Sequence, residues 1–528
     1  MSLQLLVSRF LLYTITTTMM LFIQPSSADI YYHIKHIDNR VYIKADFGKY
    51  SANKQIKLYI PSNIWGIYYD KQIKNIKVYD GNFNVQNSIA ILNTDGPLKI
   101  EYELINITKD EFLAEFANRY YHFFDKQRFY MLGLGSFIYP DEKNDDKENV
   151  VIDISSTAKK IAYNFPSYFY KSPINVPFKK LQEIIIFGNE DFYFKNDKDI
   201  TILVWTTDNA LGKYLNDIAS NVFIKHKEFW DNTEKMILVV SIPNPFISKR
   251  NKLGATVISN SIIAFINPNA NEEEDLYRLF SHEILHFWFG SNMLNGPKWF
   301  TEGFTDYYVD KINYYYSGNF QKFISNYNKK LYLYFSSPFS NLTDKDIEQH
   351  FFNLQVVEKL PYLKGYLIAG QVDSITDLDA VLKLMFKNCK ENKQKCVFSP
   401  RLLAEYIQNI SIVQQKHIYS LISNFNKAKL VYSFLGKAIL SSKIIPSVKY
   451  INLNITSIIK NRYITGKYLN SLDSSFDVNK SYTLLNIEQD YENNLRFFIE
   501  DVGKSQEFFP ATVPIITKIP QYSLKKQS

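Results

Sequence analysis

The 528-residue sequence lacks the long apolar runs and the cysteine clusters that mark several classes of protein. After Ile23, no segment reaches the ~20 consecutive apolar residues that a membrane-spanning helix needs, so we expect no span in the body of the chain. The chain has only 2 cysteines, and no histidine lies close to them in the sequence. This scarcity argues against a cysteine-based zinc site.

A strong excess of one charge is also absent. The sequence has 61 lysines and arginines against 53 aspartates and glutamates, and the formal net charge of +8 is mild for this length. Binding to a nucleic-acid backbone requires clustered positive charge, and we find no such cluster. We therefore expect no nucleic-acid partner and interpret the lysines as part of a solvated surface.

The amino-terminal segment indicates export. Arg9 precedes an apolar stretch over residues 10–23, and the small residues at 26–28 suit cleavage before Asp29. We expect a secretory signal peptide over residues 1–28 and a periplasmic or secreted protein. A retained membrane anchor is the alternative interpretation, although the stretch is short for a full span.

The two cysteines, Cys389 and Cys396, have six residues between them. In an oxidising compartment a local disulfide between them is expected. Two free thiols are the alternative.

Residues 280–286 have the sequence FSHEILH, in which two histidines lie four positions apart. On a helix this spacing puts His282 and His286 on one face, one turn apart, where both imidazoles can bind one cation. Glu302 follows after fifteen intervening residues and can supply a carboxylate as the third ligand. Two imidazoles and one carboxylate leave a coordination position open for water. We therefore expect one Zn²⁺ ion and hydrolase chemistry.

Two helices are expected to carry these ligands. The acidic run at 272–275 suits the positive end of a helix dipole, and Gly290 suits the end of that helix. A second helix is expected to begin at Pro297. On it, Asp306 lies one turn beyond Glu302, where a carboxylate can accept the second ring proton of a zinc-bound histidine. A solvated helix charge is the alternative interpretation of Asp306.

Three motifs in this order resemble the zinc aminopeptidases of the thermolysin-like, or gluzincin, superfamily. The segment HFWFG at 286–290 is similar to the family that includes leukotriene A4 hydrolase and aminopeptidase N. The segment WFTEGFTDYY at 299–308 is closer to the glycyl aminopeptidase family, which is the branch that we favour. The third motif is PYLKG at 361–365. The resemblance covers roughly residues 209–390.

The resemblance implies a peptidase mechanism with a peptide or protein substrate. Glu283 would take a proton from the attacking water and pass it to the leaving amine. Tyr362, in the third motif, would donate a hydrogen bond to the oxyanion. The alternative for Tyr362 is one more packed aromatic residue in a chain with 39 tyrosines and 40 phenylalanines.

The sequence departs from the family pattern in two places. The connection between His286 and Glu302 is shorter than is usual, which a loop can absorb. Upstream, the segment GATVISNS at 254–261 corresponds to an edge strand, and the resemblance implies that Gly254 and Ala255 contact the substrate. Family members have a glutamate on this strand that binds the free amino terminus, and this chain has Val257 there. An apolar side chain cannot neutralise an ammonium group.

The pattern along the chain predicts an α+β protein of several domains. Alternating apolar and polar residues predict an N-terminal β-sandwich over residues 29–206. The motifs imply a thermolysin-like mixed α/β peptidase domain over 207–442, whose later part has helical patterns at 366–386, at 400–410 and, with interruptions, at 418–440. Residues 443–528 have strand-like runs and are expected to form a small β-rich region, or a degenerate PDZ module.

Three functions are compatible with these features. The first is an exported zinc peptidase that acts near peptide amino termini. The second keeps the zinc chemistry in an endopeptidase or oligopeptidase with an altered amine site, which Val257 favours. The third is a catalytically inactive, zinc-stabilised domain that binds peptides or proteins, although such a domain has little need of Glu283.

Overall fold

The computed structural model describes residues 30–48, 54–64, 67–86, 88–107, 120–141, 149–164, 173–196, 200–206, 208–230, 236–241, 253–259, 261–266, 273–290, 294–337, 340, 342–351, 355–391, 396–407, 412–423, 425, 433–434, 438–446, 454–456, 467–470, 482–489, 495–501, 508–510 and 518–524. The expected signal peptide at 1–28 lies outside these residues. Internal contacts divide the chain into two units, Met1–Ile107 with Tyr120–Asp191, and Thr108–Arg119 with Phe192–Ser528.

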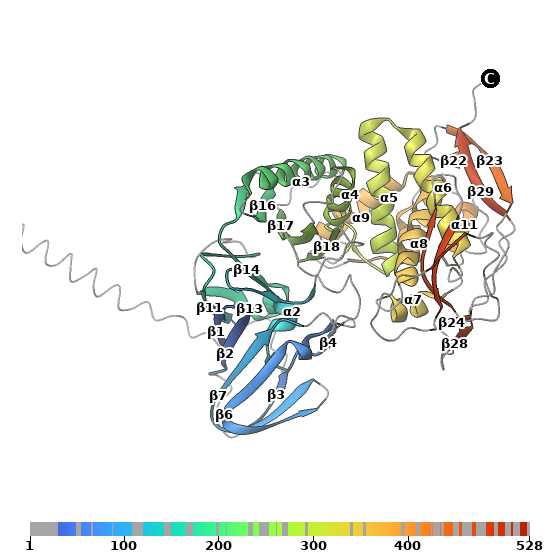
Figure 1. Ribbon diagram of the computed structural model, residues 1–528. Coiled ribbons are helices and arrows are strands. Elements are labelled where there is room, and N and C mark those ends of the chain that lie inside the picture. The colour runs from blue at the N-terminus through green and yellow to red at the C-terminus, as the bar shows by residue number, and fades with distance from the viewer. Residues whose placement is uncertain are drawn as a thin grey trace, which may run out of the picture. The chain divides into compact units, whose positions relative to one another are not determined.

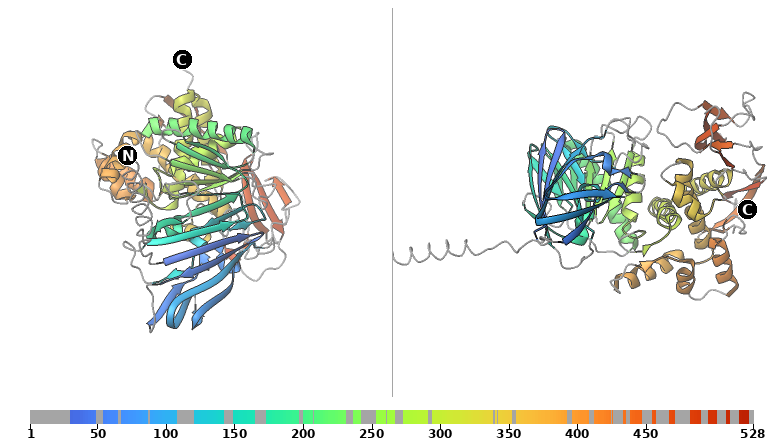
Figure 2. Two further views of the ribbon diagram at one scale, coloured as in Figure 1. Left: turned by 90° about the vertical axis from the view of Figure 1, so that its left-hand side faces the viewer. Right: turned by 90° about the horizontal axis from the view of Figure 1, so that it is seen from below.

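The first unit is built from β-strands, which Figure 2 shows lying alongside one another. Its strands are β1 (Ile30–Ile37), β2 (Arg40–Asp46), β3 (Lys54–Tyr59), β4 (Asn63–Ile64), β5 (Ile67–Tyr68), β6 (Ile73–Gln86), β7 (Ile89–Ile105), β8 (Phe123–Phe124), β9 (Phe129–Leu132), β10 (Tyr139–Pro140), β11 (Asn149–Ser156), β12 (Lys160–Tyr163), β13 (Ile174–Pro177) and β14 (Ile185–Asn189), with one short helix α2 (Gly133–Ser136). One sheet has the order β10-β3-β7-β2-β1-β11-β13, with β6 paired to β7, and a second has the order β12-β14-β9-β8.

Buried and more exposed side chains alternate along the first strand of this unit. In β1, the buried residues Ile30, Tyr32 and Ile34 alternate with more exposed ones, because successive side chains of a strand point to opposite faces. Met131 of β9 and Ile186 of β14, both from the second sheet, belong to the same buried core as the residues of β1. The two sheets therefore share one hydrophobic core.

The second unit begins with a five-stranded sheet. Its strands are β15 (Tyr193–Asn196), β16 (Ile200–Trp205), β17 (Met236–Ser241), β18 (Leu253–Ile258) and β19 (Ser261–Ile266), in the order β15-β16-β17-β19-β18. The first two strands lie within residues 29–206, the expected first domain, and they pair into the sheet of the second unit. A strand's own pattern does not say which sheet it will join.

Helices make up most of the remaining part of this unit (Figure 1). They are α3 (Asn209–Trp230), α4 (Glu273–Leu285), α5 (Lys298–Ser317), α6 (Phe320–Ser336), α7 (Asp344–His350), α8 (Gln355–Asp373), α9 (Leu378–Glu391), α10 (Pro400–Tyr406) and α11 (Ile412–Ser423). None of the described helices combines the length and the apolarity that crossing a bilayer requires.

Two of the expected helical segments differ from the structure. The segment 366–386 is divided between α8 and α9, because the Asp377 side chain accepts from the Ala380 N–H at 3.0 Å and begins a new helix. In the segment 418–440, α11 ends at Ser423, and among the described residues that follow, Ser433–Phe434 is the strand β22 and Ala438–Pro446 is the strand β23.

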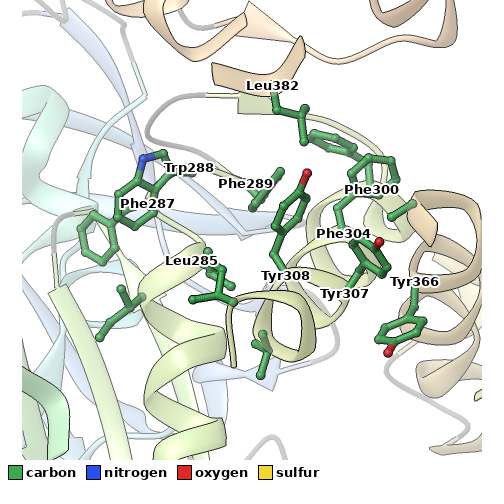
Figure 3. Close-up of a cluster of buried hydrophobic side chains, with 14 of the residues drawn as sticks. Leu285, Phe287, Trp288, Phe289, Phe300, Phe304, Tyr307, Tyr308, Tyr366 and Leu382 are labelled. Atoms are coloured by element: carbon green, nitrogen blue, oxygen red, sulfur yellow. The ribbon is translucent and has the colours of Figure 1, made fainter. Parts of the chain in front are cut away.

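Aromatic side chains hold the helices of this unit together. Figure 3 shows part of this core, to which α4, the turn after it, α5 and α8 contribute. The rings of Phe289 and Tyr308 are stacked with centroids 5.4 Å apart, and Trp230 of α3 packs against Tyr308 at 4.7 Å. The elements that carry the expected zinc ligands are therefore fixed by close packing of large side chains.

Two short strands lie between helices of this unit and pair with each other, β20 (Leu294–Asn295) and β21 (Cys396–Val397). The described strands after α11 are β22 (Ser433–Phe434), β23, β24 (Asn454–Thr456), β25 (Lys467–Asn470), β26 (Tyr482–Gln489), β27 (Leu495–Asp501), β28 (Phe508–Pro510) and β29 (Lys518–Leu524). The strands from β22 onward form a sheet in the order β22-β23-β29 and another in the order β25-β27-β26-β24-β28. The expected boundary at 443 falls inside β23, and a PDZ module stays a prediction.

Candidate metal centre

The helix α4 carries the first histidine and the glutamate beside it. It begins at Glu273 with three acidic residues in its first turn, as the dipole argument predicts. It ends at Leu285 and not at Gly290. His286 therefore lies in a tighter turn, in which its N–H donates to the Glu283 carbonyl three residues back, at 3.3 Å.

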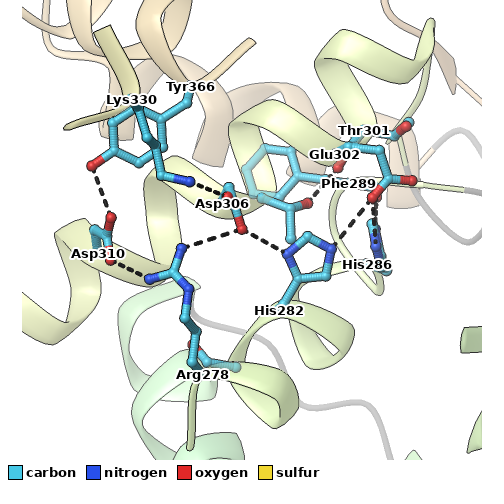
Figure 4. A network of polar contacts seen from close by, with 12 residues as sticks. Arg278, His282, His286, Phe289, Thr301, Glu302, Asp306, Asp310, Lys330 and Tyr366 are labelled. Atoms are coloured by element: carbon cyan, nitrogen blue, oxygen red, sulfur yellow. Dashed lines mark hydrogen bonds and ion pairs between the residues drawn. The ribbon is translucent and has the colours of Figure 1, made fainter. Parts of the chain in front are cut away.

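The helix α5 brings the carboxylate to these histidines. It begins at Lys298, one residue after the expected Pro297. Glu302 Oε2 lies 3.3 Å from His282 Nε2 and 3.5 Å from His286 Nε2 (Figure 4). One ligand atom from each of the three residues lies within 4.8 Å of the other two. The structure thus brings together the three residues that the sequence proposed as zinc ligands.

Hydrogen bonds on the far side of each imidazole set the ring orientations. His282 Nδ1 donates to Asp306 Oδ1 at 3.1 Å, and His286 Nδ1 donates to the Phe289 carbonyl at 3.0 Å. With each Nδ1 engaged as a donor, the lone pair that can bind a metal is on Nε2, the atom that faces Glu302. Asp306 thus accepts a hydrogen bond from the second ring nitrogen of His282, as expected. No feature of the sequence indicates that the Phe289 carbonyl does the same for His286.

Two positively charged side chains around Asp306 were not predicted from the sequence. Lys330 of α6 makes an ion pair with its Oδ2, and Arg278 Nη2 of α4 lies 3.4 Å from its Oδ1. Arg278 lies one helical turn before His282, so the sequence contains a local indication that Arg278 is near this histidine. Nothing near Lys330 in the sequence connects it to this site.

The carboxylates change the pKa values of the imidazoles. Burial alone would lower the pKa of His282, but hydrogen bonds to Asp306 and Glu302 outweigh burial and raise it to about 10. Burial would likewise lower the pKa of His286, and the charge of Glu302 raises it instead. Burial would raise the pKa of Glu302, but the two histidines hold it well below its usual range. The site therefore attracts positive charge, as protons or as a metal ion.

The residues present fit a divalent ion. Two imidazole nitrogens and one carboxylate oxygen are the protein ligands of a common class of catalytic zinc site. The network that includes the histidines has four carboxylates and two cations: Glu283, Glu302, Asp306 and Asp310, with Arg278 and Lys330. Within this group of described residues the excess is two negative charges, which one Zn²⁺ would balance.

Glu283 and Tyr362 both lie beside the histidines. Glu283 is buried, with 7% of its surface exposed, and its negative charge contributes to raising the pKa of both His282 and His286. Tyr362 lies within α8, and its ring is stacked near that of His282, with centroids 5.7 Å apart. The motif at 361–365 therefore meets the first motif in space, although 76 positions separate Tyr362 from His286.

The strand β18 contains Gly254, Ala255 and Val257. It lies at the end of the described sheet and pairs with β19, where Gly254 is opposite Phe265. Ala255 is buried in the hydrophobic core, and Val257 packs against the same core. The Ala255 side chain therefore faces the interior, so any contact of Ala255 with a substrate would come from its backbone.

Cys389 and Cys396 are joined by a disulfide. The bond connects the last turn of α9 to β21, which pairs with β20 just before α5. The paired strands β21 and β20 therefore connect the disulfide to α5, the helix that carries Glu302.

No protein-family model matches the sequence, and no curated protein matches it. Solved structures do match. The crystal structure of an aminopeptidase N family protein from Idiomarina loihiensis is similar over 94% of this chain and 98% of that chain, with a TM-score of 0.61 at 12% sequence identity. At this identity the likeness is one of fold. The chain has a mixed α/β fold similar to that of the aminopeptidase N family protein.

Weaker matches have TM-scores below 0.5. Native yeast LTA4 hydrolase is 11% identical, with a TM-score of 0.45 over 77% of this chain and 69% of that chain. An M1 zinc metallopeptidase from Deinococcus radiodurans is 12% identical, with a TM-score of 0.43 over 74% of this chain and 92% of that chain.

Proposed function

We propose that this protein is a zinc-dependent peptidase whose metal ion is held by His282, His286 and Glu302. The observation that carries the proposal is the convergence of three ligand atoms within 4.8 Å, with both Nδ1 atoms already engaged elsewhere. The fold likeness to an aminopeptidase N family protein supports the same class of hydrolase.

The chemistry that a bound zinc ion would supply is positive charge, which polarises the scissile carbonyl and makes water a stronger acid. Glu283 is the proposed general base: its carboxylate takes a proton from the attacking water and passes it to the nitrogen of the leaving amine. Its position beside both histidines supports this role. The Tyr362 phenol is proposed to donate a hydrogen bond to the oxyanion of the tetrahedral intermediate, which its contact with the His282 ring supports.

The substrate is proposed to be a peptide that extends along β18, with backbone contacts at Gly254 and Ala255. The strand lies at the end of the described sheet, and such an edge can pair with an extended peptide. Action near the amino terminus of the peptide is the leading proposal, in line with the name of the Idiomarina loihiensis protein.

A second candidate function is that of an endopeptidase or oligopeptidase. It is favoured by Val257, which packs its side chain against the hydrophobic core where the family pattern has an amine-binding glutamate. An inactive peptide-binding domain is a weaker candidate, because a buried glutamate beside two histidines serves catalysis and has no evident use in binding alone.

The experiment that tests the proposal measures hydrolysis of one peptide set, each member with a free and with an acetylated amino terminus. Stepwise cleavage of the free peptides alone, lost with a chelator and restored by zinc, is the expected result for an aminopeptidase. Cleavage of acetylated peptides at internal bonds would establish the endopeptidase. No cleavage of either set by the zinc-loaded protein would overturn the proposed function.

Three finer features belong to the same proposal. Export by a signal peptide over residues 1–28 fits a disulfide between Cys389 and Cys396, since disulfides persist in oxidising compartments. Membership of the glycyl aminopeptidase branch rests on the segment at 299–308. The domain division into residues 29–206, 207–442 and 443–528 is modified by the assignment of β15 and β16 to the second unit.

A further inference from the structure

Asp306 contacts two positively charged side chains as well as His282. Its Oδ2 makes an ion pair with Lys330 Nζ, and its Oδ1 lies 3.4 Å from Arg278 Nη2. The same Oδ1 accepts the hydrogen bond from His282 Nδ1 at 3.1 Å. The cations therefore hold both oxygens of the carboxylate that orients the histidine (Figure 4).

Three helices contribute to the network around Asp306, and each carries two residues of the network four positions apart. Residues four positions apart lie on the same face of a helix. The pairs are Arg278 and His282 on α4, Asp306 and Asp310 on α5, and Asn326 and Lys330 on α6. Arg278 Nη1 lies 2.6 Å from Asp310 Oδ1, and Asn326 donates to the same oxygen at 3.1 Å. The contacts form only when the three helices have this one register.

The two cations differ in their exposure to water. The Lys330 side chain is 15% exposed and its Nζ lies 4.7 Å from the centre of the Tyr366 ring, whereas the Arg278 side chain is 38% exposed. Water screens an ion pair, so the interaction of Asp306 with Lys330 is the stronger of the two.

We propose that Lys330 and Arg278 are positioning residues of the metal centre. By holding the Asp306 carboxylate they hold the His282 ring, so that its Nε2 faces the metal ion. A buried carboxylate costs free energy when its oxygens lack partners, so removal of a cation would let it move away from the histidine. The inference rests on the proposed zinc site and goes beyond it, because it assigns a role to two residues outside the proposed set of ligands, through their contacts with Asp306.

A simpler role for these cations would be to join the helices. The chain offers a matched control for this role, because Lys322 of α6 pairs with Glu274 of α4 at 2.6 Å. That pair joins α6 directly to α4, the helices on which Lys330 and Arg278 lie, but its side chains are 43% and 71% exposed and neither of them contacts Asp306 on α5. A substitution at Lys322 therefore removes a link between α4 and α6 without affecting Asp306.

The test is the dissociation constant for Zn²⁺ of the full chain, measured by titration against a competing chelator. Residues that orient a metal-bound histidine typically change metal affinity by about 10- to 100-fold. We expect Lys330→Met to weaken zinc binding by that factor, Arg278→Met to weaken it less, and Lys322→Met to leave it unchanged. Lys330→Arg, which keeps the charge, should restore most of the affinity.

A double-mutant cycle separates positioning from general stability. If Lys330 acts through Asp306, then Lys330→Met should have little further effect on zinc affinity in an Asp306→Asn background. Equal affinity of Lys330→Met and the unchanged protein, or full additivity with Asp306→Asn, would overturn the inference. If Lys330→Met does not fold, the same cycle is measured with Arg278→Met, because the Arg278 side chain is the more exposed of the two. Absence of zinc binding by the unchanged protein would overturn the proposed function itself, together with this inference.

Discussion

Gly303 and Gly365 lie against each other where α5 meets α8. A Cβ atom on Gly303 would lie 2.4 Å from Gly365 Cα, and one on Gly365 would lie 1.6 Å from the Trp299 carbonyl oxygen. Gly303 follows Glu302 directly, and Gly365 comes three residues after Tyr362. This backbone contact therefore sets the separation between the proposed zinc ligand on one helix and the proposed phenol donor on the other.

Gly303→Ala is expected to lower both stability and activity. The added methyl group must push the helices apart, and such overpacking costs about 1–3 kcal/mol. Denaturant unfolding measures the loss. Gly48→Ala is the matched control, because the nearest atom to a Cβ there is 3.8 Å away. Equal stability of the two variants would contradict this account of the helix contact.

Glu283→Gln is expected to keep zinc and lose nearly all turnover. The amide retains the shape of the carboxylate but cannot accept the proton of the attacking water, and a general base contributes about 10²- to 10⁴-fold in rate. Zinc content and kcat are measured on the same preparation. Turnover at the original rate would exclude Glu283 as the base.

Tyr362→Phe is expected to lower kcat by about 10²- to 10³-fold, the usual effect of removing one oxyanion donor. The ring that packs near His282 is retained, so zinc affinity should not change. A variant with normal kcat would assign Tyr362 a packing role only.

Removal of the metal is expected to make stability depend on pH. In the metal-free chain, burial lowers the pKa of His282, but hydrogen bonds to Asp306 and Glu302 raise it from its ordinary 6.5 to about 10. A raised folded pKa gives stability that is fully present below the unfolded value and is lost as pH rises through the folded value.

The unfolding temperature of the chelator-treated protein should therefore fall between pH 6.5 and about 10. His282→Gln cannot bind this proton, so the same curve should be flatter for that variant. An unfolding temperature that rises across this window in the unchanged chain would contradict the assignment of the raised pKa to His282.

Local patterns were sufficient to predict several elements of the fold. The alternation in β1 and β2 and the acidic start of α4 depend on neighbouring residues only. The assignment of β15 and β16 to the second sheet depends on partners such as Met236, paired with Ile200 in β17, which are distant in the sequence. The sheet that a strand joins is therefore decided by segments far from it in the sequence.

The residues of the proposed metal centre can be recognised from short segments of the chain. His282 and His286 lie one helical turn apart with Glu283 directly after the first, and Glu302 and Asp306 repeat the four-residue spacing on the next helix. These relationships are local, so they can be derived without the fold.

The way in which α4 and α5 face each other, and the residues around the three proposed ligands, depend on contacts between segments that are distant in the sequence. The ion pair of Lys330 with Asp306 and the stacking of Tyr362 near His282 join separate helices, and the contact of Gly303 with Gly365 allows α5 and α8 to approach. The physical reason is that the register between helices is set by the packing of many side chains at once, and no short segment of sequence contains that information.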